Sequence, residues 1–268
     1  MKVSISALSI AYGLTPEALR YYEEKGLLTP ERTASSGFRR FSIGDMQKLG
    51  IIKSLQRQGF SLDEIYHILN GCPQAELIAM MDDKRAELRA QINQSRAIYD
   101  RLTMTTDLLR DSSHLLMKPR LCVGCAAYLV DFDSVAALWQ SVPQMPLLKD
   151  LIEALPLTSY CSIVPLARLK GSDAPVRIGI AAPAEYAAVI KADFSQMRMS
   201  AGPRVLRMLF ELRPPHSSSI APVIEAAVDF LRAQQLIPVC EGYTRQYSWS
   251  VNESGQMCHL SELIIPVM

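Results

Sequence analysis

QAELIAMMDDKRAELRAQINQSRAIYDRLTMTTDLLRDSSHLLMK, residues 74–118, contains neither glycine nor proline. At about 1.5 Å per residue, an unbroken helix over this run is roughly 65 Å long. One globular domain cannot enclose a helix of that length, so the sequence predicts that it joins two separately folded parts. We expect a first domain over residues 1–72, the helix over 73–118 and a second domain over 119–268.

A seam of residues spaced alternately four and three apart runs along this helix. One half of the seam is apolar at five of its six places, with Ser95 as the exception, while the other half is mixed. This pattern favours a two-stranded coiled coil and hence a homodimer. The alternative is a long amphipathic helix that packs on its own domain. The seam consists of Met81, Arg85, Leu88, Ile92, Ser95, Tyr99, Leu102, Thr106, Leu109, Ser113 and Leu116.

The chain has 268 residues and a formal net charge of +1, but its charge is unevenly distributed. Residues 20–57 carry eight lysines and arginines against four acidic residues, whereas residues 118–268 carry thirteen of each. The basic excess therefore lies in the first domain, where a polyanion would bind. No apolar run reaches the 18 or so residues of a membrane span, and the first ten residues lack the apolar stretch of a signal peptide. The sequence therefore predicts a cytoplasmic protein without a membrane partner.

The chain has six cysteines. Because disulfides are rare in cytoplasmic proteins, we expect these cysteines to be small buried apolar residues rather than a disulfide framework. Cys122 and Cys125 form a C-x-x-C, a spacing that binds metals or changes with redox state in other proteins. A structural zinc site usually has a second pair at similar spacing, and the sequence has none. We predict structural cysteines and no metal or cofactor, and keep a thiol or metal sensor based on Cys122 and Cys125 as an alternative.

The first domain shows the signals of a helix, a tight turn and a second helix. Thr15 is expected to cap the second helix, Pro16 fits its first position and Gly26 ends it. Residues 32–41 place a polar turn before an aromatic and basic cluster, which fits a β-hairpin. Ser42 is expected to cap a further helix to about Gln58, and residues 61–64 open another with a capping box.

The segments ALRYYEEKGLLTP, SGFRRFS and IKSLQRQGFSLDEIYHIL, in this order and before a long helix, resemble the MerR family of bacterial transcription regulators. The resemblance covers roughly residues 3–117. It implies a winged helix-turn-helix that dimerises through an antiparallel coiled coil. It also implies binding to promoter DNA and activation of RNA polymerase by bending and untwisting the promoter.

By this resemblance Arg20, Tyr21 and Tyr22 lie on the recognition helix, and Arg39 and Arg40 lie on the wing. Arginine binds phosphate or guanine through two hydrogen bonds, and a tyrosine hydroxyl reaches phosphate oxygens. Neighbours on a helix point about 100° apart, so one of the two tyrosines is expected in the core. Thr15 and Lys53 complete the predicted DNA contacts. Glu23 and Glu24 are expected on a solvated face.

The second domain reads as strand, helix, strand, strand, repeated twice. This order predicts an α+β fold with internal pseudo-two-fold symmetry. The expected strands are 125–132, 159–165, 176–181, 204–212, 239–251 and 257–267, and the expected helices are 135–141, 147–155 and 220–235.

The last two strands are expected to form a hairpin with Ser254-Gly255 as its two-residue turn. Odd positions from Glu241 to Val251 then carry all the aromatic residues on one face, namely Tyr243, Tyr247 and Trp249. Such a turn would pair Trp249 with Leu260 and Tyr247 with Glu262. An aromatic wall with a carboxylate suits a lipophilic cation. An ordinary sheet face, with Arg245 paired to Glu241 or Glu262, remains the alternative.

This second part resembles the gyrase-inhibitor-like effector domain of multidrug-sensing MerR relatives, in its strand order, in SELIIPV and in Tyr160 within LTSYCSIVPL. In those relatives a glutamate in the penultimate strand meets cationic drugs, and Thr244 stands at that place here. We therefore predict Glu262 or Glu241 as the acid, with Tyr160 and Tyr186 as further wall residues.

These patterns predict a ligand-responsive transcription regulator rather than an enzyme. An acid and tyrosines in a pocket are also suited to acid–base work, so a small-molecule hydrolase is a second alternative. The sequence contains no phosphate-binding glycine loop, no HExxH and no G-x-S-x-G.

Overall fold

The computed structural model describes residues 2–33, 37–212, 220–251, 255 and 257–268. The chain divides into two compact units, Met1–Gln91 and Ile92–Met268, and each is described by itself. The long helix contributes its first part to one unit and its second part to the other.

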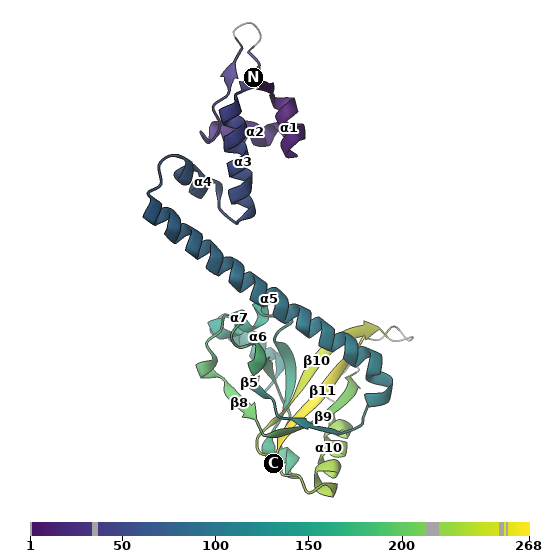
Figure 1. Cartoon of the computed structure of the whole chain (residues 1–268). Coiled ribbons are helices and arrows are strands. Elements are labelled where there is room, and N and C mark those ends of the chain that lie inside the picture. The colour runs from purple at the N-terminus through teal and green to yellow at the C-terminus, as the bar shows by residue number, and fades with distance from the viewer. Residues whose placement is uncertain (1, 34–36, 213–219, 252–254, 256) are drawn as a thin grey trace. The chain divides into compact units, whose positions relative to one another are not determined.

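The first unit contains the helix-turn-helix that the sequence predicts (Figure 1). The N-cap of α2 is Thr15, whose hydroxyl accepts a hydrogen bond from the Ala18 amide. Ser42 and Ser61 each form a capping box at the start of α3 and α4. Its elements are β1 (Val3–Ser4), α1 (Ile5–Tyr12), α2 (Pro16–Glu24), β2 (Glu31–Arg32), β3 (Arg39–Phe41), α3 (Ile43–Arg57) and α4 (Leu62–Leu69).

A small sheet of order β1-β3-β2 completes this unit and forms the predicted wing. Strand β1 pairs with β3 through Val3 and Phe41, and β2 pairs with β3 through Glu31 and Arg40. Apolar residues of the helices bury against this sheet and leave one core, which includes Leu8, Leu19, Tyr22, Leu27, Phe41, Leu49, Ile52 and Ile65.

Helix α5 (Gln74–Leu115) is continuous over 42 residues, as the sequence predicts. The apolar residues of the seam are exposed on it, among them Leu88, Ile92, Tyr99, Leu102 and Leu109. A different side of its second half, with Ala97 and Arg101, is buried. The helix therefore both packs on its own domain and leaves an apolar seam in solvent.

The second unit is built on an antiparallel sheet of strand order β4-β9-β11-β10-β6-β7-β5-β8. The strands are β4 (Arg120–Val123), β5 (Ala126–Phe132), β6 (Ser159–Val164), β7 (Arg177–Pro183), β8 (Arg198–Ala201), β9 (Arg204–Leu212), β10 (Gly242–Val251) and β11 (Met257–Val267). The helices are α6 (Val135–Ser141), α7 (Pro146–Glu153), α8 (Leu166–Leu169) and α10 (Ala221–Ala233), with short 3₁₀ turns η1 (Ala184–Tyr186) and η2 (Phe194–Gln196). The sequence did not predict β4, β8, α8 and the two 3₁₀ turns, which are too short to show a periodic pattern.

The pairing within this sheet has the predicted internal symmetry. In one half, β7 lies between β5 and β6; in the other, β11 lies between β9 and β10. Helices α6 and α7 connect β5 to β6, and α10 connects β9 to β10. The halves join through β6 and β10, which pair antiparallel.

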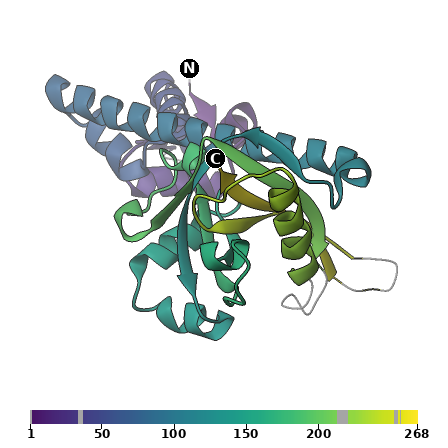
Figure 2. The same cartoon turned by 90° about the horizontal axis from the view of Figure 1, so that it is seen from below.

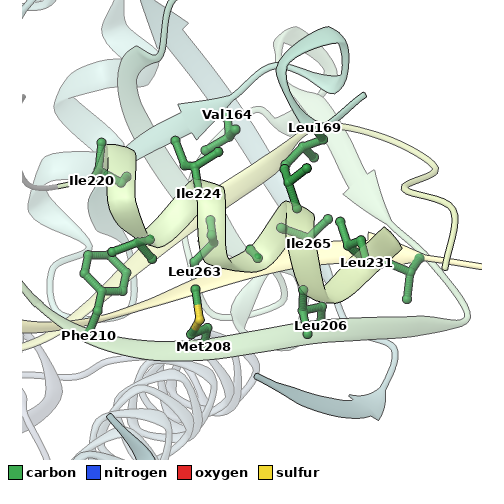
Figure 3. Packing of buried hydrophobic residues seen from close by; sticks show 14 of the residues in the cluster. Val164, Leu169, Leu206, Met208, Phe210, Ile220, Ile224, Leu231, Leu263 and Ile265 are labelled. Carbon is green, nitrogen blue, oxygen red and sulfur yellow. The ribbon is translucent and has the colours of Figure 1, made fainter. Parts of the chain in front are cut away.

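The two faces of the sheet pack against different helices (Figures 1 and 2). On the face that carries Thr244, Gln246, Ser261 and Leu263, here called the pocket face, α10 packs on β9 and β11. Figure 3 shows Ile224 and Leu231 of that helix over Leu263 and Ile265. The opposite face, with Tyr243, Arg245, Glu262 and Ile264, is called the α5 face because Arg101 of α5 reaches β10 there.

The register of the final hairpin differs from the prediction. Arg245, not Tyr247, is opposite Glu262, and His259, not Leu260, is opposite Trp249. A β-bulge between Gln246 and Ser248 leaves Tyr247 as an extra residue, and Val251 pairs with Met257, which makes the connection longer than two residues. Because a bulge shifts the alternation by one, Trp249 lies on the pocket face while Tyr243 lies on the α5 face. Ser254 of the predicted turn lies outside the described residues.

Candidate functional site

A cavity of about 250 Å³ lies on the pocket face, between α6 and the strands β6 and β10. This volume is slightly below the roughly 300–1,000 Å³ usual for ligand pockets, so it suits a ligand of one or two rings. The lining residues are Val135, Leu138, Trp139, Tyr160, Cys161, Ser162, Ile178, Leu212, Thr244, Gln246, Trp249, His259 and Ser261.

Aromatic rings form two sides of this pocket. Trp139 of α6 and Tyr160 of β6 have ring centroids 6.3 Å apart, and Trp249 stacks on His259 at 4.3 Å. Both tryptophans of the chain therefore line the pocket. Their side chains are about half exposed, at 53% and 57%, so they stand at the mouth.

The inner wall is polar but uncharged. The hydroxyl of Thr244 accepts a hydrogen bond of 2.8 Å from the Ser162 amide. The side-chain nitrogen of Gln246 is buried and has no hydrogen-bond partner among the described residues. Cys161 borders the cavity, but its side chain lies in the buried cluster with Tyr243 and Ile264 on the α5 face. Burial, and secondarily the charge of Asp131, raise the pKa of this thiol, which therefore stays protonated. None of the described lining residues is Asp, Glu, Lys or Arg.

Charge is instead concentrated on the α5 face, around Glu262. This carboxylate is fully buried and lies 3.1 Å from Arg120 and 3.4 Å from Arg207. The Tyr247 hydroxyl donates a 2.8 Å hydrogen bond to it. Burial, followed by the charge of Glu262, raises the pKa of Tyr247. Glu262 thus has three partners and does not face the cavity.

Arg101 of α5 lies beside this group and is 5% exposed. Its guanidinium donates a hydrogen bond to the Gln246 carbonyl and lies 4.5 Å from the centre of the Tyr247 ring. Burial and the neighbouring Arg245 lower the pKa of Arg101, and its Nη1 has no hydrogen-bond partner in the described part of the chain. Arg245 itself pairs with Glu185 at 2.8 Å.

Glu241 lies in a third place, at the start of β10. It forms ion pairs with Arg177 and Arg198, and both arginines also bind Asp131. This carboxylate, like Glu262, is already neutralised by arginines.

The structure therefore separates the predicted effector residues. Tyr160 and Trp249 line the cavity, while Tyr186, Tyr243, Tyr247 and Glu262 lie on the α5 face or beside it, and Glu241 lies at the strand end. The expectation that Tyr243, Tyr247 and Trp249 share one face was wrong, because the bulge at Tyr247 reverses the alternation.

The sequence analysis singled out Thr244 as the residue at the place of the relatives' glutamate, but it did not predict that Thr244 and Gln246 line the pocket together. Thr244 and Gln246 occupy even positions of β10, whereas the aromatic residues occupy odd ones. This alternation was the signal in the sequence that could have shown that Thr244 and Gln246 share a face. Trp139 on α6 and His259 on β11 carried no pattern that connects them to β10, since only tertiary packing brings them together.

On the recognition helix α2, the structure separates the two tyrosines as expected. Tyr22 is 5% exposed and donates a hydrogen bond to Gln56, whereas Tyr21 is 45% exposed. Arg20 is exposed and pairs with Glu17 at 3.3 Å. Thr15 caps the helix. The contacts of Arg20, Tyr21, Tyr22 and Thr15 with DNA stay predictions.

On the wing the two arginines differ. Arg39 forms an ion pair with Glu23 of α2, to which Arg32 also comes within 3.7 Å, while Arg40 is exposed. Glu23 therefore ties the wing to the recognition helix, and its expected place on a solvated face was wrong. The Lys53 ammonium donates to the Tyr12 carbonyl.

Cys122 and Cys125 are partly buried beside an apolar cluster of the α5 face, and Cys125 lies 3.9 Å from the Tyr243 hydroxyl. Among the described residues, His67, Cys72 and Glu76 are the three side chains whose possible metal-ligand atoms gather within 4.8 Å. His67 and Glu76 already pair with each other at 2.9 Å. Within the described ranges, no helix has the length and apolar character to cross a membrane.

Two family models match the chain. One, described as MerR HTH family regulatory protein, covers residues 3–72, and the other, described as MerR, DNA binding, covers residues 46–105. The transcriptional regulator CueR of Salmonella typhi is 30% identical over 105 residues, which are 37% of this chain and 76% of CueR. The mercuric resistance operon regulatory protein of Serratia marcescens is 32% identical over 108 residues, 40% of this chain and 68% of that protein.

Among solved structures, a cryo-EM structure of an EcmrR–DNA complex in EcmrR-RPo aligns with 99% of this chain and 99% of its own, at 16% identity and a TM-score of 0.38.

Proposed function

Since the chain belongs to the MerR family of HTH regulatory proteins and is a DNA-binding transcription regulator, we propose that a small lipophilic ligand controls it through the pocket of the second unit. The dimer would bind a pseudo-palindromic promoter and activate transcription by RNA polymerase when the ligand is present. Bending and untwisting the promoter costs several kcal/mol and must be offset by phosphate contacts.

For DNA binding, the proposal assigns sequence reading to α2 and backbone contact to the wing. Arg20 and Tyr21 are exposed on α2 and suit the major groove. Of the two arginines predicted to contact DNA from the wing, Arg40 is exposed, whereas Arg39 is held by Glu23. Arg40→Ala should therefore lower the salt dependence of DNA binding by the amount expected for one lost phosphate contact. Arg39→Ala should weaken DNA binding mainly because the wing is no longer fixed to α2 by Glu23.

The coiled coil is supported by the exposed seam of α5. Leu102 and Leu109 are 59% and 46% exposed in the single chain, on a helix whose other side already packs on its own unit. A second copy of the helix would bury them. Leu102→Glu should shift sedimentation toward monomer and abolish operator binding, because it would bury an unpaired charge at the interface.

The charge of the ligand separates two versions of the proposal. The sequence predicts a lipophilic cation, for which the pocket offers the rings of Trp139, Tyr160 and Trp249. Cation–π attraction supplies roughly 0.5–2 kcal/mol per ring, and less at an exposed mouth. The two acids expected to supply the counter-charge, Glu241 and Glu262, are bound to arginines outside the described lining.

One observation carries the ligand response: Gln246 belongs to both the pocket and the attachment of α5. Its side chain lines the cavity, while its carbonyl accepts a hydrogen bond from Arg101 of the long helix. The β-bulge at this point leaves Tyr247 unpaired and interrupts the ladder, and we propose that the strand can take up a second local arrangement there. A ligand that moves Gln246 would therefore change how α5 is held, by as much as its affinities for the two arrangements differ.

The experiment combines binding and transcription. Compounds that quench the fluorescence of the two tryptophans are selected and then added to an in vitro transcription assay with the full-length protein on its own promoter. The proposal expects that compounds bound in the pocket raise transcription while operator occupancy stays nearly constant. Quenching without any change in transcription would reject ligand control, and raised transcription by compounds that leave both tryptophans unaffected would reject this pocket.

A further inference from the structure

The inner wall of the pocket offers hydrogen-bond donors rather than negative charge. Its described polar groups include the Gln246 amide and the Thr244 hydroxyl. The Thr244 oxygen already accepts a hydrogen bond from the Ser162 amide, so the hydroxyl can offer a ligand its hydrogen and one remaining lone pair. The Gln246 nitrogen is a buried donor that finds no acceptor among the described residues.

A buried donor without an acceptor destabilises the empty site and is a reason to expect an acceptor from the ligand. The backbone carbonyl of the same residue accepts a hydrogen bond from Arg101, so the residue that carries the donor also contacts α5.

A permanent cation fits this wall poorly. Moving a charge out of water is costly unless a counter-charge receives it, and the two candidate carboxylates are neutralised elsewhere by four arginines. The rings that would attract a cation, Trp139 and Trp249, are about half exposed, so water weakens that attraction. An anion meets the same cost, since the described lining contains no Lys or Arg.

We infer that the pocket binds an uncharged aromatic molecule of one or two rings that carries a hydrogen-bond acceptor, with Gln246 as the residue that recognises the acceptor. The rings of the ligand lie against Trp139, Tyr160 and Trp249, and its acceptor points to the β10 bulge. This inference rests on the proposed function for the location of the site. It differs from the sequence-based expectation in the charge of the ligand.

The test uses two probes of nearly the same shape at pH 8. Quinoline is neutral and has an acceptor nitrogen, while N-methylquinolinium carries a permanent charge and has no acceptor. Both are titrated into the full-length protein, with quenching of the two tryptophans as the readout. The wild-type protein is expected to bind quinoline at least ten-fold more tightly.

Three variants decide the role of Gln246. Gln246→Leu keeps the volume and removes the donor, so it should weaken quinoline about ten-fold and leave N-methylquinolinium unchanged. Gln246→Glu installs the missing acid and should reverse the preference in favour of the cation. Gln144→Leu, at an exposed glutamine outside the lining, is the matched control and should change neither.

The outcomes separate the inference from the proposed function. Tighter binding of N-methylquinolinium to the wild type, with quenching of the tryptophans, would overturn the inference and leave the pocket as the ligand site. Equal loss of both probes in Gln246→Leu would also overturn it, because Gln246 would then shape the site without recognising an acceptor. Absence of quenching by either probe up to their solubility limits would overturn both the inference and the pocket. Circular dichroism of each variant checks that it is folded.

Discussion

The two faces of the sheet in the second unit differ in their polar groups: one face buries ion pairs and the other has a cavity with none among its described residues. The α5 face buries Glu262 among arginines and tyrosines and fills the space with them. The pocket face has a cavity whose described lining contains no Asp, Glu, Lys or Arg. A buried ion pair is costly to break, so it suits a permanent attachment. A wall without ion pairs and with an unpaired hydrogen-bond donor suits a ligand that binds reversibly.

We therefore expect substitutions on the α5 face to change the stability of the protein and substitutions on the pocket face to change ligand binding. The largest effect on stability is expected at Glu262. Glu262→Gln leaves Arg120 and Arg207 without their buried counter-charge. We expect a loss of about 3–5 kcal/mol in the free energy of unfolding, measured by urea denaturation. Tryptophan quenching by pocket ligands should be unchanged in the folded fraction.

The control for this substitution is Glu225→Gln, at an exposed position of α10, which should change the stability by less than about 0.5 kcal/mol. If Glu262→Gln weakened ligand binding but left stability unchanged, the roles of the two faces would have to be exchanged.

Arg101 connects the two faces, so its removal should abolish the transcriptional response to ligand while it leaves the stability of the protein nearly unchanged. Arg101→Met keeps the apolar stem and removes a buried charge for which no carboxylate partner lies among the described residues. We expect stability within about 1 kcal/mol of wild type, because the lost hydrogen bond is offset by the relieved desolvation. The coupling between ligand and transcription, about 1–3 kcal/mol in such systems, should be lost.

Arg110→Met provides the matched control on the same helix, since Arg110 is exposed and pairs only with its neighbour Asp107 among the described residues. It should respond to ligand like the wild type in the transcription assay. A fully responsive Arg101→Met protein would remove the bulge and α5 from the signalling path.

Much of this arrangement is local and was open to prediction from sequence. The start of α2 follows from Thr15 and Pro16, and the length of α5 follows from the absence of glycine and proline. The pseudo-symmetry follows from the order of strands and helices. The resemblance to one family added the role of the hairpin as a wing and the antiparallel direction of the coiled coil, which local patterns do not specify.

The division of the site between two faces was not open to prediction, because it depends on one extra residue. Without the bulge at Tyr247, strict alternation would put Trp249 on the same face as Glu262. The partners of Glu262 come from β4 and β9, far away in the sequence, and no spacing rule connects Arg120 or Arg207 to it. The same holds for Glu23, whose role depends on the position of the wing.

On the pocket face, Trp249→Ala should affect binding more than stability. The indole stacks on His259 at the mouth and is 57% exposed, so its removal exposes little core. We expect ligand affinity to fall about ten-fold, or roughly 1.4 kcal/mol, with Trp139 as the remaining fluorescent reporter. The unfolding free energy should change by less than about 1 kcal/mol. A loss of stability as large as that of Glu262→Gln would show that this face, too, is part of the permanent structure.

The smallest effect is expected from Tyr247→Phe, which removes one hydrogen bond to Glu262 and keeps the ring beneath Arg101. At pH 8 it should cost about 0.5–1.5 kcal/mol of unfolding free energy, since the carboxylate keeps both arginines. The pH dependence reports the raised pKa of Tyr247, to which burial contributes most and Glu262 next. The pKa of Tyr247 is raised in the folded protein, so its contribution is complete below the unfolded value of about 10 and is lost as the pH rises above it, where the unfolded chain ionises first. The phenylalanine variant lacks this loss, so the difference between the two proteins should narrow between pH 8 and pH 10.5 in parallel urea titrations. A difference that stays constant over this range would mean that the pKa of Tyr247 is not raised in the folded protein, and hence that its hydroxyl is not buried against Glu262.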